Sequence, residues 1–195
     1  MFSSLFDYFA RQTEVPLSEQ DILLIQKAFV PKKFKKRQFL LQEGDVCKYI
    51  SFIVKGAVRQ YTVDDRGNEQ VLNLAIENWW TSDRESYHKQ TPSMYNIDAW
   101  EETEALMLPK ADGWYDKVNA IPAFCDLRKK LDDAHHMAMQ SRLHNSINHT
   151  AEYRYNELMQ KYPEFILRFP QHVVASYLGI TKETLSRIRN SSLKR

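Results

Sequence analysis

Polar and charged side chains that could recognise a nucleic acid lie close together near the end of the chain. Lysine and arginine can donate hydrogen bonds to O6 and N7 of guanine, and glutamate can accept one from N4 of cytosine. The residues of these kinds that one short helix would present are Thr181, Lys182, Glu183, Ser186, Arg187 and Arg189. Thr181 and Lys182 fall at the start of that helix, where backbone N–H groups can also hold a phosphate. For any single one of these side chains, a phosphate contact or simple solvation explains the sequence as well as base recognition does.

The spacing around these residues predicts two short helices joined by a tight turn. Ala175 is small enough for the second helix to pack closely, and Gly179, four residues later, tolerates the positive φ of such a turn. Thr181 can cap the second helix. The apolar positions around the turn are filled by Val174, Leu178, Ile180, Leu185 and Ile188. The pattern favours a helix-turn-helix whose second helix enters the major groove of DNA, and the alternative is an ordinary pair of helices in a helical domain.

Charge is distributed unevenly along the chain. Residues 150–195 carry 8 Lys or Arg against 4 acidic residues, whereas residues 1–149 carry 19 against 21. A basic segment on a slightly acidic body suggests an anionic partner, although a solvated helical surface would have the same composition.

The middle of the chain has the hydrophobic pattern of a β-sheet protein. Between residues 32 and 108, short alternating or apolar runs are broken by turn residues about every ten positions, which predicts six or seven antiparallel strands. Residues 65–68 (Asp-Arg-Gly-Asn) separate two such runs and indicate a hairpin. Ahead of this region, Ser18 and Asp21 predict the capped start of a helix.

A long helix is expected over residues 121–147. Five of its residues recur at alternating spacings of three and four and could form the seam between two copies of the helix: Phe124, Leu127, Leu131, Ala134 and Ala138. The alternative is that this stripe packs on the chain's own sheet. A second stripe, formed by Leu131, Met139 and Leu143, could serve that purpose instead.

These elements predict an α+β protein in three parts. Residues 1–120 form a domain built on an antiparallel β-body, which the resemblance given next identifies as a sensor domain, residues 121–148 form a connecting and dimerisation helix, and residues 149–195 form a DNA-binding domain. No apolar run approaches the roughly 20 residues of a membrane span, so no membrane partner is expected. The 2 cysteines are too few for a disulfide framework, which indicates a reducing cytoplasm.

The order of these parts resembles the CRP/FNR family of bacterial transcription regulators. In the sensor part the resemblance rests on residues 42–45 (Gln-Glu-Gly-Asp) and on residues 49–61, which are similar to the family's jelly-roll pattern. In the last part, residues 180–188 resemble its recognition helix, and the basic–Glu–x–x–x–Arg pattern for base recognition falls on Lys182, Glu183 and Arg187. The resemblance implies a homodimer joined along the long helix and a sensor coupled to DNA affinity. RNA polymerase is a further expected partner.

The sensor part departs from the members of this family that bind cyclic nucleotides. Those members hold the ribose and the cyclic phosphate with a Gly-Glu pair and an Arg-Ser or Arg-Thr pair. When Ala99 is placed on the family's strand alanine, Ser93 and Met94 stand where Arg-Ser would be, and residues 78–87 contain no glycine. We therefore expect weak or absent binding of cAMP and cGMP. An FNR-type iron–sulfur cluster is excluded by the cysteine count.

A different small molecule could still bind the sensor part. Its candidate pocket would be lined by Trp79, Trp80, Asp83, Arg84, Ser86, Tyr87, Ser93 and Met94. The favoured alternative is that Trp79 and Trp80 simply fill the core of the barrel.

Enzymatic activity is not expected. The sequence contains no nucleophile motif, no phosphate-binding loop and no convergent metal ligands, so no metal site is predicted. His135 and His136 are adjacent and point about 100° apart on a helix. The preferred function is a homodimeric, sequence-specific regulator that binds double-stranded DNA without a cofactor. The alternative is a small-molecule or cyclic-nucleotide sensor whose helical tail contacts proteins.

Overall fold

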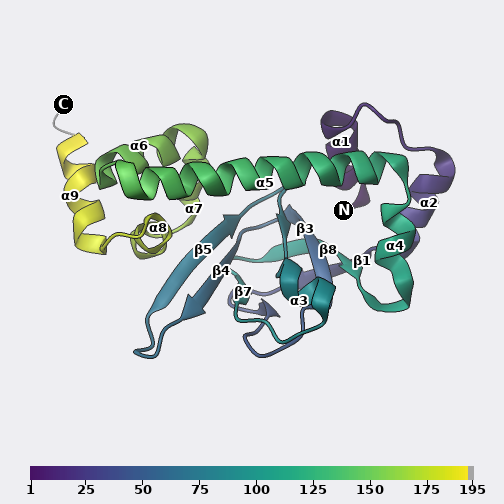
Figure 1. Cartoon of the computed structure of the whole chain (residues 1–195), viewed down its shortest axis with the longest axis horizontal. Helices are drawn as coiled ribbons and strands as arrows, with labels where there is room; N and C mark the ends of the chain where they lie inside the picture. The colour runs from purple at the N-terminus through teal and green to yellow at the C-terminus, as the bar shows by residue number, and fades with distance from the viewer. Residues whose placement is uncertain (193–195) are drawn as a thin grey trace. The chain divides into compact units, whose positions relative to one another are not determined.

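The computed structural model of the chain describes residues 1–192 (Figure 1). Two helices precede the strands, α1 (Phe2–Gln12) and α2 (Glu19–Ala28). The start of α2 is the capping box that the sequence predicts. The N–H of Asp21 donates to Ser18 Oγ at 3.2 Å, and the N–H of Ser18 donates back to Asp21 Oδ2 at 3.0 Å.

Eight strands follow within the described residues, and they form two four-stranded sheets. The first sheet has the order β1-β8-β3-β6, and the second has the order β2-β7-β4-β5. The strands are β1 (Val30–Phe34), β2 (Phe39–Leu41), β3 (Tyr49–Lys55), β4 (Val58–Val63), β5 (Glu69–Ala75), β6 (Trp80–Thr81), β7 (Asn96–Ala99) and β8 (Thr103–Pro109). The registers of β1 with β8, β8 with β3, β3 with β6 and β2 with β7 are antiparallel, which confirms the predicted α+β class.

Short helices interrupt and then follow the strands. α3 (Arg84–Lys89) lies between β6 and β7, and a 3₁₀ turn, η1 (Ala111–Gly113), leads from β8 into the helical part. The later helices are α4 (Trp114–Asn119), α5 (Pro122–Asn148), α6 (Ala151–Lys161), α7 (Pro163–Arg168), α8 (Gln171–Leu178) and α9 (Lys182–Ser192). α5 is the long helix that the sequence predicts.

The chain divides into two compact units. The first unit comprises residues 1–60 and 75–133, and the second comprises residues 61–74 and 134–195, of which the structure describes those up to 192. The division falls inside α5, whereas the sequence places domain boundaries at the two ends of this helix. The structural division also places the distal part of the β4–β5 hairpin in the unit that contains α6 to α9.

The core of the first unit is built from its two sheets and the helices around them. One apolar cluster joins α1 and α2 to strands β3 and β8 and to the beginning of α5, with Leu5, Phe9, Ile25, Phe52 and Leu106 almost completely buried. Burial of these side chains is the main stabilising contribution to this unit. Within residues 1–192, no helix combines the length and the apolar character that crossing a membrane requires.

One ion pair lies inside this unit. The side chains of Arg59 on β4 and Asp98 on β7 are only 1% and 3% exposed, and Arg59 Nε donates to Asp98 Oδ1 at 2.8 Å. A second bond, from Nη2 to Oδ2, spans 3.1 Å and makes the contact bidentate. The guanidinium also lies 5.2 Å from the centre of the Trp100 ring. The pair joins two neighbouring strands of the second sheet, and removing either partner would leave a buried charge without its counter-charge.

Candidate nucleic-acid interface and sensor site

Two helices and a glycine turn form the polar segment near the end of the chain. α8 ends at Gly179, which has φ +67°, and the N–H of Ile180 donates to the carbonyl of Ala175 at 3.0 Å. This is the left-handed ending that the sequence predicts at Gly179, and it turns the chain directly into α9. No heavy atom lies within 4 Å of the place where a Cβ on Gly179 would stand. The constraint on this glycine is therefore its backbone conformation.

The start of α9 is capped as expected. The N–H of Thr184 donates to Thr181 Oγ1 at 3.2 Å, and the two hydroxyl oxygens lie 3.1 Å apart. Because the hydroxyl of Thr181 accepts from the helix backbone, this side chain is committed to the cap. Thr181 therefore positions α9, and it does not line the polar hollow described below.

The inner face of α9 is apolar. Leu185 and Ile188 are buried, and so are Val174 and Ala175 on α8. An aromatic group supports α8 from α7, because Phe165 lies with its ring centre 6.2 Å from that of Tyr177. This packing decides which side of α9 faces outward.

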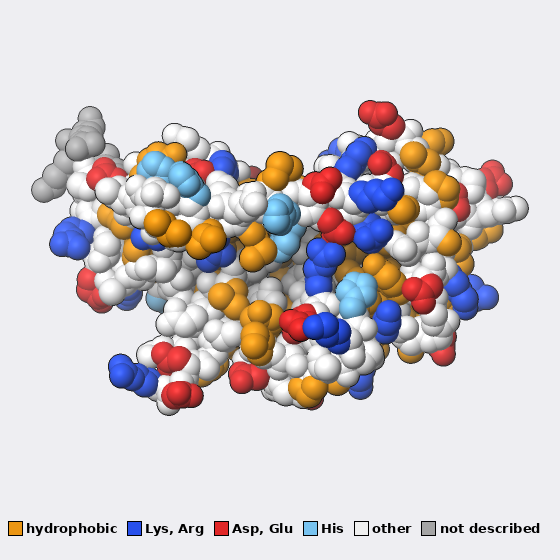
Figure 2. Space-filling model, viewed as in Figure 1, with side chains coloured by type: hydrophobic (Ala, Val, Ile, Leu, Met, Phe, Trp, Pro, Cys, Tyr) orange, Lys and Arg blue, Asp and Glu red, His pale blue; other side chains and the backbone are white. Residues whose placement is uncertain are grey.

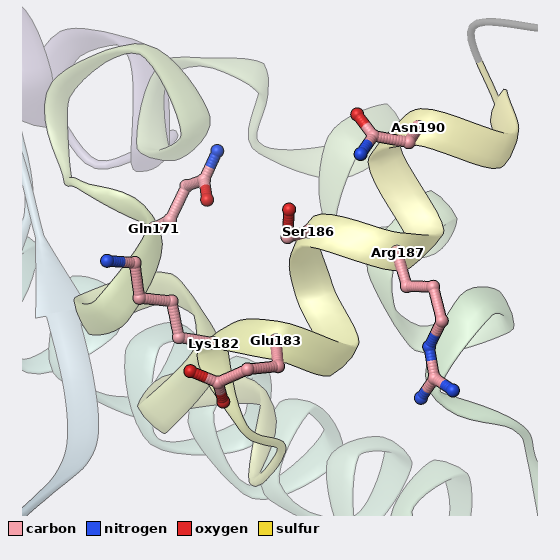
Figure 3. A pocket seen from close by; sticks show the side chains of 6 residues that line it. All are labelled: Gln171, Lys182, Glu183, Ser186, Arg187 and Asn190. Atoms are coloured by element: carbon pink, nitrogen blue, oxygen red, sulfur yellow. The ribbon is translucent and has the colours of Figure 1, made fainter.

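The outward side of α9 borders an open hollow of about 400 Å³ (Figure 3). Four predicted residues line it, namely Lys182, Glu183, Ser186 and Arg187. Lys182 and Arg187 extend to opposite sides of the helix (Figure 3). Arg189, which the sequence also nominated, is half-buried and lies outside this lining.

Two residues of this surface were missed by sequence reasoning. Gln171, the first residue of α8, and Asn190, four residues after Ser186, complete the lining of the hollow. Asn190 continues the helical spacing of Lys182 and Ser186, and this pattern could have identified it. Gln171 comes from the other helix, so only the crossing of α8 and α9 brings it to the same place. Both side chains are amides, which can donate and accept hydrogen bonds together.

The predicted polar residues of the sensor bind one another. Asp83 caps α3 by accepting from the N–H of Ser86 at 3.1 Å, and its other oxygen accepts from Ser93 Oγ at 2.7 Å. Ser86 Oγ in turn donates to the carbonyl of Thr91 and accepts from the N–H of Cys47 at 2.8 Å. All three polar side chains, Asp83, Ser86 and Ser93, are buried. A ligand at this position would have to displace bonds that the chain already makes.

The predicted aromatic residues of the sensor lie in packed surroundings. The Trp80 ring centre lies 5.1 Å from that of Phe52 and 6.3 Å from that of Phe124. Trp79 packs against another apolar cluster of the unit, which includes Phe34, Ile53 and Ile97. Tyr87 is completely buried, and this burial raises the pKa of its hydroxyl far above the ordinary value. These contacts favour the interpretation in which the tryptophans fill the core.

The remaining two candidates lie on the surface. Arg84 pairs with Asp132 of α5 at 2.8 Å, Asp132 also accepts from Arg128, and Met94 is 63% exposed. Figure 2 shows basic and acidic side chains interleaved over the first half of α5, where Arg128 and Asp132 lie.

A smaller cavity of about 200 Å³ in the same unit is lined by residues that include Leu41, Cys47 and Ser82. None of the eight predicted pocket residues borders it.

Comparisons with known proteins give the fold a context. Residues 31–113 match the family model of the cyclic nucleotide-binding domain, and no curated protein sequence matches the chain. Among solved structures, FixK2 from Bradyrhizobium japonicum is 16% identical with a TM-score of 0.69, over 84% of this chain and 83% of FixK2. A CRP/FNR-family transcriptional regulator from Thermus thermophilus is 18% identical with a TM-score of 0.65, over 85% and 86% of the two chains. The c-di-GMP responsive global regulator CLP from Xanthomonas campestris is 12% identical with a TM-score of 0.70, over 91% and 92%.

The chain has the fold of the CRP/FNR transcription regulators. The resemblance inferred from the sequence is thereby confirmed in the sensor part and in the helical part. Of these structural relatives, one is described as a transcriptional regulator and another as a global regulator linked to virulence gene expression.

Two residues used in the sequence comparison with nucleotide-binding members lie inside the first unit. Ala99, the residue on which the sequence comparison depends, is buried at the end of β7. Ser93, which the sequence analysis aligned with the family's arginine, donates its hydroxyl to Asp83 Oδ2 at 2.7 Å.

The stripe that the sequence predicts as a dimer seam divides between the core of the first unit and the surface of α5. Phe124 and Leu127 are buried in the core of their own unit, and Leu131 packs against that core. Ala134 and Ala138 are exposed. The large apolar side chains on the surface of α5 belong to its second half, namely Met137, Met139, Leu143 and Ile147, which are 60 to 72% exposed. The first part of the predicted seam therefore serves the chain's own core, which is the alternative that the spacing left open.

Gly179→Ala should destabilise the second unit by about 1–2 kcal/mol, because an L-residue at positive φ meets its own carbonyl. Thermal denaturation of the wild-type chain and the variant measures the change.

The matched control is Gly179→Asn, since asparagine tolerates this conformation best among the residues that carry a Cβ. It should recover most of the lost stability. Equal stability of Gly179→Ala and the wild type would show that the turn does not impose a left-handed residue.

Proposed function

We propose that the chain is a homodimeric, sequence-specific transcription regulator that binds double-stranded DNA in the cytoplasm. The observation that carries this proposal is the outward face of α9, where Lys182, Glu183, Ser186 and Arg187 border an open hollow. The buried face of the same helix fixes its orientation. The protein acts without enzymatic chemistry, and RNA polymerase is its expected protein partner.

The residue types on this face suit duplex DNA. Lys182 and Arg187 supply positive charge and donors for guanine or phosphate, and Glu183 supplies an acceptor for cytosine. The amides of Gln171 and Asn190 match the paired donor and acceptor of adenine. Ser186 can contact either a base or the backbone. An α-helix with such a face fits the width of the major groove.

The exposed stripe on α5 supports the proposed dimerisation. Met139, Leu143 and Ile147 recur at intervals of four and present one apolar line along the helix. A second copy of this helix is the natural cover for such a line. Two recognition helices then contact two half-sites, which multiplies the sequence selectivity that one short helix can provide.

The sensor is proposed to respond to something other than cAMP or cGMP, or to no small molecule. Ser93, which the sequence comparison aligns with the family's arginine, donates to Asp83, and the partly buried Trp80 packs against the apolar core. The second candidate function is a small-molecule or cyclic-nucleotide sensor whose helices contact proteins, and the match of residues 31–113 to the cyclic nucleotide-binding domain favours it.

Arg187→Ala should reduce the preference for a specific site by about 1–3 kcal/mol if the guanidinium contacts a base. The site is first selected from a pool of random duplexes, and affinities for it and for unrelated DNA are then measured over a range of salt concentrations. The wild-type affinity should fall steeply with salt, with a slope of about one for each phosphate contacted.

Lys129→Ala is the matched control, because it removes one exposed positive charge from the first unit. This variant should keep the wild-type preference. An unchanged preference in Arg187→Ala would remove Arg187 from base recognition. Failure of the wild type to bind any duplex at low salt would favour the second candidate function.

Calorimetric titration of the dimer with cAMP or cGMP should show no heat of binding up to about 1 mM nucleotide, since the phosphate would meet the carboxylate of Asp83. A micromolar binding isotherm for either nucleotide would contradict this interpretation of Asp83 and Ser93.

A further inference from the structure

The distal part of the β4–β5 hairpin lies in the same unit as the two helices of the proposed DNA-binding surface. Residues 61–74 belong to the second unit, whereas the bases of the two strands, up to Gln60 and from Ala75, belong to the first. β5 is the outermost strand of its sheet, and Figure 1 shows α8 next to it. The hairpin therefore connects the sensor covalently to the unit that carries α9.

Ser176 of α8 binds the backbone of β5 at two points. Its hydroxyl oxygen accepts from the N–H of Val71 at 2.9 Å, and its hydroxyl donates to the carbonyl of Glu69 at 3.0 Å. A serine hydroxyl can accept and donate at the same time. It thus takes the place of one residue of a neighbouring strand along the edge of the sheet.

Arg142 of α5 also forms hydrogen bonds to both β5 and α8. Its guanidinium donates to the carbonyl of Leu72 on β5 and, at 2.7 Å, to the carbonyl of Tyr177 on α8. The guanidinium carbon lies 4.1 Å from the centre of the Tyr177 ring. Tyr177 is in the last turn of α8, where backbone carbonyls lack helical partners and a positive charge is favourable.

We propose that Ser176 and Arg142 are positioning residues that lock the β4–β5 hairpin onto α8 and hold α9 ready for DNA. We call this pair of contacts the hairpin latch. This inference rests on the proposed function, because its consequence is a change in DNA affinity. It assigns a role in DNA binding to two side chains that do not line the proposed DNA-binding surface.

The closed latch is compatible with DNA binding. The hollow beside α9 is lined by residues 171, 182, 183, 186, 187 and 190, and none of these takes part in the latch. Holding α8 to the hairpin reduces the conformational freedom of α8 and α9 before DNA binds. Less conformational entropy is therefore lost when the complex forms. A loosened latch should therefore weaken specific binding.

The latch also gives the sensor a way to act on DNA affinity. Any ligand or partner that moves the hairpin away from α8 would break the bonds to Ser176 and Arg142. Such an effector would bind better to the open state, and its coupling to DNA would be reciprocal. The covalent path runs through β4 and β5.

The first experiment measures the latch without DNA. Amide hydrogen exchange is followed in the peptide that contains Val71, in the wild type, in Ser176→Ala and in Arg142→Lys. Both variants should exchange this peptide faster, because Ser176→Ala removes the acceptor of the Val71 N–H and lysine cannot bridge two carbonyls as arginine does.

Two matched controls accompany these variants. Ser146→Ala removes a hydroxyl that bonds only within α5, to the carbonyl of Leu143, and Arg11→Lys makes the same exchange on the exposed face of α1. Neither control should change exchange at Val71. Equal exchange in the wild type and in both latch variants would overturn the proposal.

The second experiment measures the ratio of affinities for a selected duplex and an unrelated duplex. Ser176→Ala and Arg142→Lys should each reduce the specific affinity by about tenfold, the effect of one lost charged or shared hydrogen bond. Arg142→Lys keeps the positive charge, so a loss cannot arise from weaker attraction to phosphates. The control variants should keep both affinities.

The outcomes separate the latch from the proposed function. Faster exchange at Val71 with an unchanged ratio of affinities would overturn the positioning role. Failure of the wild type to bind any duplex would overturn the proposed function, and the exchange measurement would still decide whether the latch forms.

Discussion

The packing of α9 on α8 is the constraint on which the account of this protein depends. A small residue, Ala175, and a left-handed glycine, Gly179, allow the two helices to meet and the chain to turn between them. Leu185 and Ile188 then bury one face of α9. The polar face is outward as a direct consequence, since a short helix cannot bury one side without presenting the other. The charge and shape that suit DNA are thus set by apolar contacts.

The sensor unit shows the opposite arrangement, in which polar groups are turned inward and satisfied. Asp83, Ser86 and Ser93 exchange hydrogen bonds with one another and with nearby backbone, and Arg59 and Asp98 form a closed ion pair. Such groups stabilise a fold only when every partner is present. Residues 31–113 of this unit match the cyclic nucleotide-binding domain, and its buried polar residues Asp83, Ser86 and Ser93 bond within the chain.

Local signals in the sequence predicted the helices and turns well. They did not predict which residues far apart in the sequence would pack together. The capping box at Ser18, the turn at Gly179 and the length of α5 are encoded within a few residues of where they act. The choice of which face of α5 is buried is not encoded locally. Apolar residues at helical spacing suit a partner helix and an internal core equally. Phe124 and Leu127 were assigned to a seam for this reason, and the structure buries them in the chain's own core. Likewise, Gln171 joins the surface of α9 only through the crossing of two helices.

The stoichiometry of the protein on its selected duplex tests the central claim most directly. Sedimentation of the complex in dilute buffer should show two chains on each duplex, because in the proposed dimer the exposed stripes of two α5 helices pair and each chain contributes one α9. A chain that sediments as a single copy and leaves every duplex unbound would contradict the account.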